Sequence, residues 1–347
     1  MLFHLGVLWR LNDASLLRTL DRVSSVSGGS LTAGALGASW AELEFDATGR
    51  SANFDDKVVG PLMRMATHTV DVWSILGGLL GPESVSRRVA ATYRRLLFDR
   101  KTLQILPSDG EGPRFVFNAT NVQSGALVRF SKPYIWDYRV GKVSEPNTEL
   151  SEVVAASSAF PPILSPAVLR FGRHAFEPGS GDDLQRPPYT RRMVLSDGGV
   201  YDNLGLETAW KGFETVLVSD AGSQFKPVPR PSRFWGSHAV RVLAIIDNQV
   251  RSLRKRDVID RYKSGVLRGA YWGIGTDIED YNVPCLPCPR VRTQQLAEQA
   301  TRLKRLPRST CERLVNWGYA VCGAAMRAYV DPGIAPAQEF PFRSRGV

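Results

Sequence analysis

The feature that most constrains the fold is a serine- and glycine-rich stretch, SSVSGGS at residues 24–30, where two different patterns meet. Residues 20–26 predict a buried strand, and residues 28–43 are rich in alanine and glycine and predict a helix. A strand that turns directly into a helix can hold a serine on a tight bend, with its hydroxyl exposed. Ser27 occupies the centre of that bend.

Such a turn, a nucleophile elbow, needs small residues two positions before and after the serine, because the strand and helix backbones nearly touch there. Ser25 and Gly29 occupy these positions. The usual pattern has glycine at both, so Ser25 is a small departure from it. A flexible loop or a helix N-cap is the alternative interpretation of the same residues.

Strands and helices alternate along the rest of the chain. Residues 114–120 and 126–131 predict a hairpin joined by residues 121–125, and further buried strands are expected at 193–195 and 215–220. Helices are expected at 2–13, 149–159, 239–264, 292–304 and 309–329. This alternation predicts an α/β fold, a three-layer α/β/α sandwich with a largely parallel central sheet. We expect one domain over residues 1–347, with a helical cap-like insertion at 55–105 and a helical C-terminal extension at 290–330.

The cap-like insertion combines apolar and basic residues. Apolar positions between 58 and 76 include Val70, Val72, Trp73, Ile75 and Leu76. A second helix, expected at 85–98, carries four arginines opposite its apolar side: Arg87, Arg88, Arg94 and Arg95. A segment of this kind can lie on a membrane surface, or it can form a partly buried helical pair with a solvated face.

The charge balance favours an anionic partner. The chain has 347 residues, with 44 lysines and arginines against 34 acidic residues and a formal net charge of +10. Nucleic acid and an anionic membrane surface both fit this charge, and simple solubility also explains it. The densest basic run, 251–256, falls on the helix expected at 239–264, where Val242, Ile245, Ile246, Val250 and Leu253 are predicted to face inward. No aromatic residues interleave with the run, so we expect a solvated helix face and no nucleic-acid partner.

Neither a membrane-spanning helix nor a signal peptide is expected. No apolar run reaches the roughly 18 to 20 residues that a spanning helix requires. The first eleven residues lack a cationic leader and an evident cleavage site. We therefore expect a cytoplasmic or peripherally membrane-bound protein.

The cysteines do not predict a metal centre. Cys285 and Cys288 have the spacing of a metal-binding knuckle, but no second pair accompanies them, and a zinc site needs four ligands. A local disulfide or two idle thiols is the favoured interpretation. We expect neither a metal nor a cofactor.

Asp197 is the second candidate for chemistry. It ends the apolar strand expected near 193–195 and is followed by Gly198 and Gly199. A plain turn explains an Asp-Gly-Gly sequence equally simply. Active sites in open α/β sheets gather at the carboxyl ends of the strands, however, and we expect Ser27 and Asp197 to share that edge. The four histidines lie at no obvious strand end.

Five segments together resemble the bacterial patatin-like phospholipases, and the resemblance extends from the first residues to about position 265. They are FHLGVL at 3–8, SVSGGS at 25–30, FNATN at 117–121, AASSAFPP at 155–162 and SDGGVYDN at 196–203. The resemblance implies a lipid acyl hydrolase, a phospholipase A-like carboxylic ester hydrolase whose Ser–Asp dyad needs no histidine. It makes Ser27 the nucleophile, Asp197 the base and the Gly28 amide an oxyanion donor, with Ser25, Gly29, Gly198 and Gly199 as supporting positions. The substrate is then a phospholipid or other acyl lipid, reached by peripheral contact with an anionic membrane surface.

One part of the family pattern has no counterpart. The glycine-rich loop that supplies most of the family's oxyanion donors should precede the segment 3–8, and the sequence starts at Met1 without it. We therefore expect an N-terminally truncated but active family member. The alternatives are a catalytically impaired membrane-binding or scaffold relative, and an ordinary α/β-hydrolase that uses Ser27, Asp197 and His238 in the usual chain order.

Overall fold

The structure is a computed structural model that describes residues 1–68, 83–222, 225–299 and 305–347. The chain divides into two compact units. The first comprises residues 15–209, with Met1 and a short stretch ending at Leu306; the second comprises residues 2–14, 210–302 and 307–347.

The strands and helices within the described residues mostly agree in position with the expected ones. The strands are β1 (Arg22–Ser25), β2 (Arg114–Asn121), β3 (Leu127–Phe130), β4 (Tyr134–Asp137), β5 (Gly141–Ser144), β6 (Ala167–Arg170), β7 (Arg192–Asp197), β8 (Thr215–Asp220) and β9 (Arg268–Gly273). The α-helices are α1 (Leu2–Asp13), α2 (Gly28–Ser39), α3 (Gly60–Ala66), α5 (Glu83–Tyr93), α6 (Leu150–Ser157), α7 (Gly199–Asp202), α8 (Trp235–Lys263), α9 (Arg290–Ala297) and α10 (Arg308–Tyr329). Short 3₁₀ or π turns connect them: η1 (Leu17–Thr19), η2 (Trp40–Glu42), η3 (Asp55–Val59), η4 (Arg94–Phe98), η5 (Leu103–Ile105), η6 (Leu206–Thr208) and η7 (Ile278–Tyr281).

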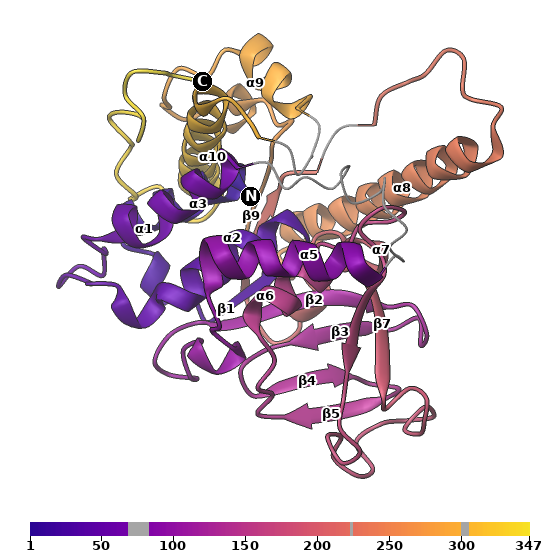
Figure 1. Ribbon diagram of the computed structural model, residues 1–347. Coiled ribbons are helices and arrows are strands. Elements are labelled where there is room, and N and C mark those ends of the chain that lie inside the picture. Colours follow the sequence, from indigo (N-terminus) through magenta and orange to yellow (C-terminus); the bar gives the residue numbers. More distant parts are fainter. Residues whose placement is uncertain (69–82, 223–224, 300–304) are drawn as a thin grey trace. The chain divides into compact units, whose positions relative to one another are not determined.

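The main sheet belongs to the first unit and is mixed, with mostly antiparallel pairs. Its strand order is β5-β4-β3-β2-β7-β6, and β1 also pairs with β2. Only β1 and β2 are parallel in this sheet (Figure 1). The prediction of a largely parallel central sheet is therefore wrong here. Three-residue connections join β3 to β4 and β4 to β5, and connections this short permit only antiparallel neighbours.

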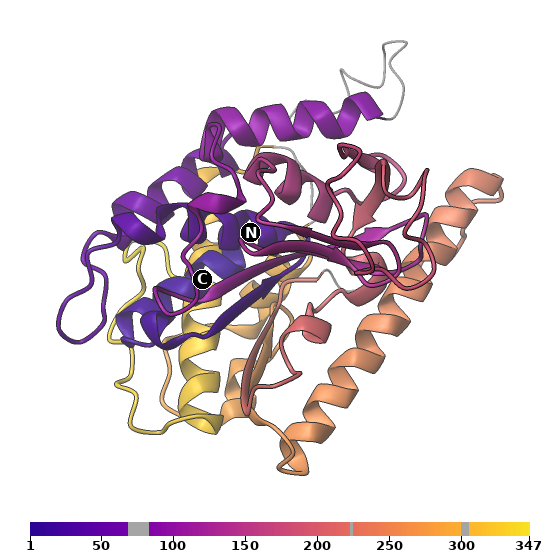
Figure 2. The same cartoon turned by 90° about the horizontal axis from the view of Figure 1, so that it is seen from below.

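The centre of the first unit is β2, whose residues from Phe115 to Asn121 are all buried. Helices α2 and α6 pack on β2, and α5 packs in turn on α6 (Figures 1 and 2). Small residues allow this close packing: a Cβ at Gly37 of α2 would lie 2.6 Å from Leu106 and 3.2 Å from Phe115. β2 is therefore the buried central strand of this unit.

The described part of the cap-like segment 55–105 contributes to the first unit's core. Val58, Leu62, Phe98 and Leu103 have no exposed surface, and α5 buries Val85, Val89 and Tyr93 while Arg87 and Arg88 stay exposed. These residues therefore follow the buried-pair interpretation with a solvated face. Five apolar positions of the same prediction, Val70, Val72, Trp73, Ile75 and Leu76, lie outside the described residues.

The second unit has its own small parallel sheet, in which β8 pairs with β9. Helix α10 packs closely on α1, because a Cβ at Gly318 would lie 1.9 Å from the Phe3 carbonyl oxygen. The expected helix at 239–264 exists as α8, but its predicted inward face is wrong. Val242, Ile245, Ile246 and Leu253 are exposed and Val250 is half-buried.

None of the helices in the described ranges combines the length and the apolar character needed to cross a membrane.

Candidate active site

Ser27 lies at the turn between β1 and α2 in a backbone conformation that non-glycine residues rarely adopt. Its φ is 53° and its ψ is −128°. Such a conformation costs about 1–3 kcal/mol, and residues that hold it cluster at active sites. Ser27 is half-buried, and its side-chain oxygen accepts no capping hydrogen bond from the helix it precedes. The geometry is that of a strained strand-to-helix turn that presents a serine hydroxyl.

A chain of buried hydroxyls supports this turn. The Ser30 hydroxyl donates to Ser25 Oγ at 3.0 Å and contacts Ser157 Oγ at 2.8 Å, and the Ser157 hydroxyl donates to the Asn118 carbonyl at 2.7 Å. The Asn118 amide in turn donates to the Ser25 carbonyl at 3.0 Å. These bonds join β1, α2, α6 and β2. Serine at position 25, where the usual pattern has glycine, is therefore a member of the supporting network.

The register of the sheet brings the end of β7 to the same place. β1 pairs with the first half of β2, with Ser25 opposite Phe117, and β7 pairs with the second half, with Asp197 opposite Ala119. Because β3 occupies the other edge of β2, β1 and β7 share one edge. β1 is parallel and β7 antiparallel to β2, so the two strands run toward each other and end on either side of Asn118.

One carbonyl fixes both chain turns. The backbone amides of Ser27 and Gly198 both donate to the Ser157 carbonyl oxygen, at 3.1 and 3.2 Å. Ser27 and the residue after Asp197 are thereby held on either side of a single acceptor at the end of α6. The carboxyl ends of β1 and β7 thus approach head to head within the sheet, and not side by side as the ends of parallel strands would.

Asp197 is buried, with 1% of its surface exposed. Its Oδ1 accepts a hydrogen bond from the Gly199 amide at 2.8 Å, and its own amide donates to the Ala159 carbonyl at 2.9 Å. Tyr93 of α5 is fully buried and lies close enough to Asp197 for the charge of the carboxylate to affect its pKa. Burial raises the pKa of Tyr93 to about 12, a hydrogen bond with Ser158 opposes this rise, and the charge of Asp197 adds to it.

The two glycines that follow Asp197 leave little room for a side chain. A Cβ at Gly198 would lie 2.3 Å from the Asn118 carbonyl oxygen, and a Cβ at Gly199 would lie 3.1 Å from Asp197 Oδ1. A side chain at either position would push against β2 or against the carboxylate itself. Both positions therefore help to set the place of Asp197.

Gly28 begins α2, and its amide donates to no acceptor among the described residues, whereas those of Ser27, Gly29 and Ser30 do. The first amides of a helix point outward and carry its positive dipole end. An oxyanion formed beside Ser27 would find the Gly28 amide available as a donor.

The histidines take no part in this arrangement as far as the structure describes it. His238 is exposed on α8 in the second unit. His4 Nδ1 contacts Ser219 Oγ at 2.8 Å, and burial lowers its pKa to about 3; His68 contacts the Arg64 carbonyl. His238 thus belongs to a different unit from Ser27 and Asp197, and the alternative triad of these three residues stays a prediction.

All four cysteines are free thiols, so Cys285 and Cys288 are not joined by a disulfide. Cys285 is exposed and Cys288 buried. Within the described ranges, no group of three or more histidine, cysteine or acidic side chains could hold a metal ion.

Sequence reasoning missed the roles of Ser157, Asn118 and Tyr93. The first two lie in the segments AASSAFPP and FNATN, which carried the family resemblance, so a signal was present without an assigned role. Tyr93 falls in the helix expected at 85–98, and no local pattern distinguishes it from an ordinary core residue.

The comparisons with known proteins agree with this region of the chain. The profile of the family described as Patatin-like phospholipase matches residues 1–210, which include every residue of the site above. Among curated proteins, none matches the chain.

Proposed function

The chain belongs to the patatin-like phospholipase family, and from that premise we propose that it hydrolyses acyl esters of phospholipids or other lipids through Ser27 and Asp197. The family implies lipid acyl hydrolase activity in general. The identity of the two residues and the phospholipase A-like reaction are the specific parts of the proposal.

The proposed reaction has two halves. Ser27 Oγ attacks the ester carbonyl carbon while its proton passes to the Asp197 carboxylate, and the carbonyl oxygen becomes an oxyanion that accepts a hydrogen bond from the Gly28 amide. Collapse of this intermediate breaks the ester bond, and the leaving alcohol takes the proton from Asp197. Water then attacks the acyl-serine by the same route and releases the fatty acid and Ser27.

The observation that carries the proposal is the shared acceptor at Ser157. Because the Ser27 and Gly198 amides bind the same carbonyl, the alcohol and the carboxylate project from backbones that one group holds in place. The strained backbone of Ser27 supports the same assignment. The carboxylate is buried, and a carboxylate removed from water accepts a proton more readily than an exposed one.

The larger organisation follows as part of the proposal. We take residues 1–347 as a single hydrolase domain, of which residues 1–210 match the family. The protein would reach its substrate by peripheral contact with an anionic lipid surface, as the net charge of +10 favours.

The test is hydrolysis of a short, water-soluble acyl ester by purified wild type, Ser27→Ala, Asp197→Asn and His238→Ala. Loss of a general base typically costs about 100- to 10,000-fold in rate, so we expect the first two variants to lose activity and His238→Ala to keep it. Unchanged hydrolysis by either of the first two variants would exclude the dyad. Loss on His238→Ala would favour the triad, and an inactive wild type would favour the impaired scaffold.

A further inference from the structure

Helix α8 packs on the rest of the second unit through one face near its C-terminal end. Within α8, all of whose residues are described, Val258 alone is buried. Lys255 Nζ lies 4.6 Å from the centre of the Tyr271 ring on β9, and the Tyr262 hydroxyl donates to the Val216 carbonyl of β8 at 2.7 Å. Residues 255, 258 and 262 therefore define the face that packs on β8 and β9.

The opposite face carries an apolar stripe that nothing in its own unit covers. Trp235, Val242, Ile246 and Leu253 are spaced by seven, four and seven residues, which places them on one side of a helix. At about 100° per residue, this side lies roughly opposite the packed face. The four side chains are 79%, 41%, 53% and 57% exposed. These four residues, which we call the α8 apolar stripe, therefore do not contribute to the core of the second unit.

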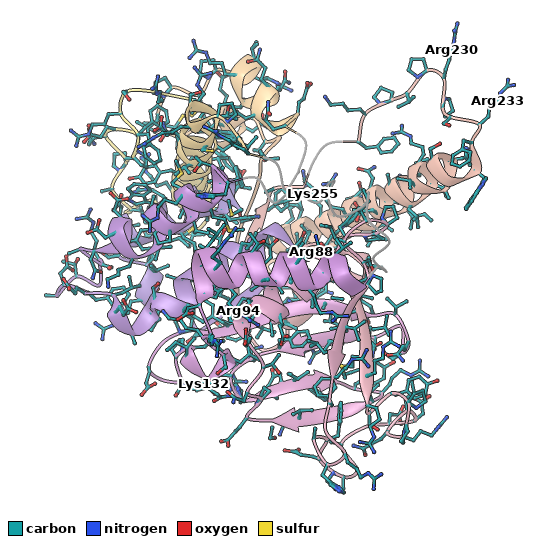
Figure 3. All side chains as sticks on the ribbon, viewed as in Figure 1. Arg88, Arg94, Lys132, Arg230, Arg233 and Lys255 are labelled. Atoms are coloured by element: carbon teal, nitrogen blue, oxygen red, sulfur yellow. The ribbon has the colours of Figure 1, made fainter. Side chains whose placement is uncertain are left out.

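The residues that lead into α8 add aromatic and basic groups. Phe234, directly before the helix, is 65% exposed. Residues 225–246 contain Lys226, Arg230, Arg233 and Arg241 and not one aspartate or glutamate. Arg230 and Arg233 project from the loop before α8, as Figure 3 shows, and neither has an ion-pair partner among the described residues.

This combination fits one kind of partner. Exposed aromatic and aliphatic side chains beside unpaired cations are the composition of segments that lie in the interface of an anionic bilayer. A second copy of the chain that docked through the same face would bring like charges together, which opposes association. The segment also lies outside the matched residues 1–210, so the family resemblance does not assign it a role.

We propose that the α8 apolar stripe, together with Phe234, Arg230 and Arg233, docks the protein on anionic phospholipid membranes. The inference rests in part on the proposed function, since a lipid acyl hydrolase must reach substrate held in a bilayer. The apolar side chains would enter the boundary between headgroups and acyl chains, and the two arginines would bind lipid phosphates.

The experiment measures flotation of the protein with vesicles of phosphatidylglycerol and phosphatidylcholine in equal parts, and with vesicles of phosphatidylcholine alone. The Ser27→Ala variant serves as the parent, so that lipid hydrolysis does not alter the vesicles. We expect binding to the anionic vesicles and little to the neutral ones. Val242→Ser with Ile246→Ser should weaken that binding at least about tenfold, because two exposed apolar side chains no longer enter the bilayer. The matched control, Val266→Ser with Val291→Ser, changes two valines of the same unit that are more exposed, at 66% and 68%, and should bind like the parent.

A second pair of variants tests the charges. Arg230→Gln with Arg233→Gln should weaken binding about 30-fold at low salt and much less at high salt, because each cation near an anionic surface contributes about a fivefold gain. Arg100→Gln with Arg173→Gln removes the same charge from exposed positions of the first unit and should have a small effect.

Four results would overturn the proposal. The parent could fail to float with anionic vesicles, or all variants could bind equally. Light scattering could show a dimer that Val242→Ser with Ile246→Ser dissociates, which would assign the stripe to a second copy. The same pair could lower the urea midpoint strongly, which would place the stripe against another part of the chain. The same α8 and arginine variants, made with Ser27 intact, are also assayed for hydrolysis of a soluble ester. If they and the wild type are inactive while membrane binding depends on the stripe, the proposed function is refuted and the membrane-docking proposal is not.

Discussion

The glycine after Asp197 gives the sharpest prediction about the site, because its environment leaves no room for a methyl group. In Gly198→Ala the new Cβ would lie 2.3 Å from the Asn118 carbonyl oxygen, 2.9 Å from the carbonyl carbon and 3.2 Å from Val26 Cγ1. Ordinary contacts begin near 3.4 Å, so the backbones must separate by about 1 Å. Asn118 is in the central strand, and the Gly198 amide is held by Ser157. Neither can move without breaking pairs of the sheet.

The magnitude follows from these contacts. Overpacking of a well-packed core costs about 1–3 kcal/mol, and we expect about 3 kcal/mol here because both clashing groups are backbone. Separation of the two backbones also displaces Asp197 from Ser27. A misplacement of about 1 Å at a reacting group costs about 100-fold in rate, so the folded variant should lose about that much activity.

The assays are urea unfolding and hydrolysis of a soluble acyl ester. The rates are measured under conditions in which most molecules of each variant are folded. The matched control is Gly172→Ala in the same unit, where a Cβ meets no atom within 4 Å. We expect the control to retain the stability and the activity of wild type. A Gly198→Ala protein with wild-type unfolding and wild-type rate would refute the packing of Gly198 against Asn118 and, with it, the assigned position of Asp197.

Three further predictions concern other groups. Tyr93→Phe should lower the free energy of unfolding by about 1 kcal/mol at neutral pH, through loss of the hydrogen bond with Ser158. The folded pKa of Tyr93, about 12, exceeds its unfolded value near 10, so wild type should lose up to about 1.4 kcal/mol per pH unit between pH 10 and 12. Tyr93→Phe has no phenol to ionise and lacks this loss. Urea unfolding should therefore show that the free energy of unfolding of wild type exceeds that of Tyr93→Phe by less at pH 11 than at pH 8. A difference that stays constant would contradict the burial of the hydroxyl. Ser157→Ala removes the hydroxyl contacts with Ser30 and Asn118 and the longer 3.3 Å hydrogen bond from the Ser27 amide, but it keeps the carbonyl that accepts from the same amide. Calorimetry should therefore show a loss of about 1–3 kcal/mol, while ester hydrolysis falls less than in Gly198→Ala. Equal losses of activity would contradict the role of the carbonyl. Ellman's reagent should titrate Cys285 alone in the native protein, because the other three thiols are buried and burial raises the pKa of Cys288 to about 12; two or more fast thiols would contradict that packing.

Local patterns in the sequence were enough to place the main elements around the site. The strand before Ser27, the small-residue helix after it and the hairpin of β2 and β3 follow from periodicity and turn residues, and each is present in the structure. Strands β4, β5, β6 and β9 were missed. The first three are only four residues long, and β9 carries two glycines that weaken its strand pattern. The direction of strand pairing depends on contacts between distant segments, and for this reason the parallel sheet was predicted wrongly.

The inward face predicted for α8 was wrong for another reason. Its apolar residues have helical spacing, and spacing alone does not distinguish a face packed on the core from one that is left exposed. The same limit applied to the site: the elbow and the Asp-Gly-Gly turn were visible as motifs, while the shared carbonyl of Ser157 and the nearby Tyr93 depend on how α5 and α6 pack. Sequence patterns thus marked Ser27 and Asp197 as candidate reacting groups, and tertiary packing supplied the contacts that hold their backbones.

Pairing of Ser27 with Asp197 can be tested by labelling with a fluorophosphonate, which reacts with an activated serine, followed by peptide mass spectrometry. We predict a single adduct on Ser27 in wild type and a labelling rate at least about 100-fold lower in Asp197→Asn, since the carboxylate accepts the serine proton. An adduct on another serine, or equal labelling rates in the two proteins, would contradict the claim.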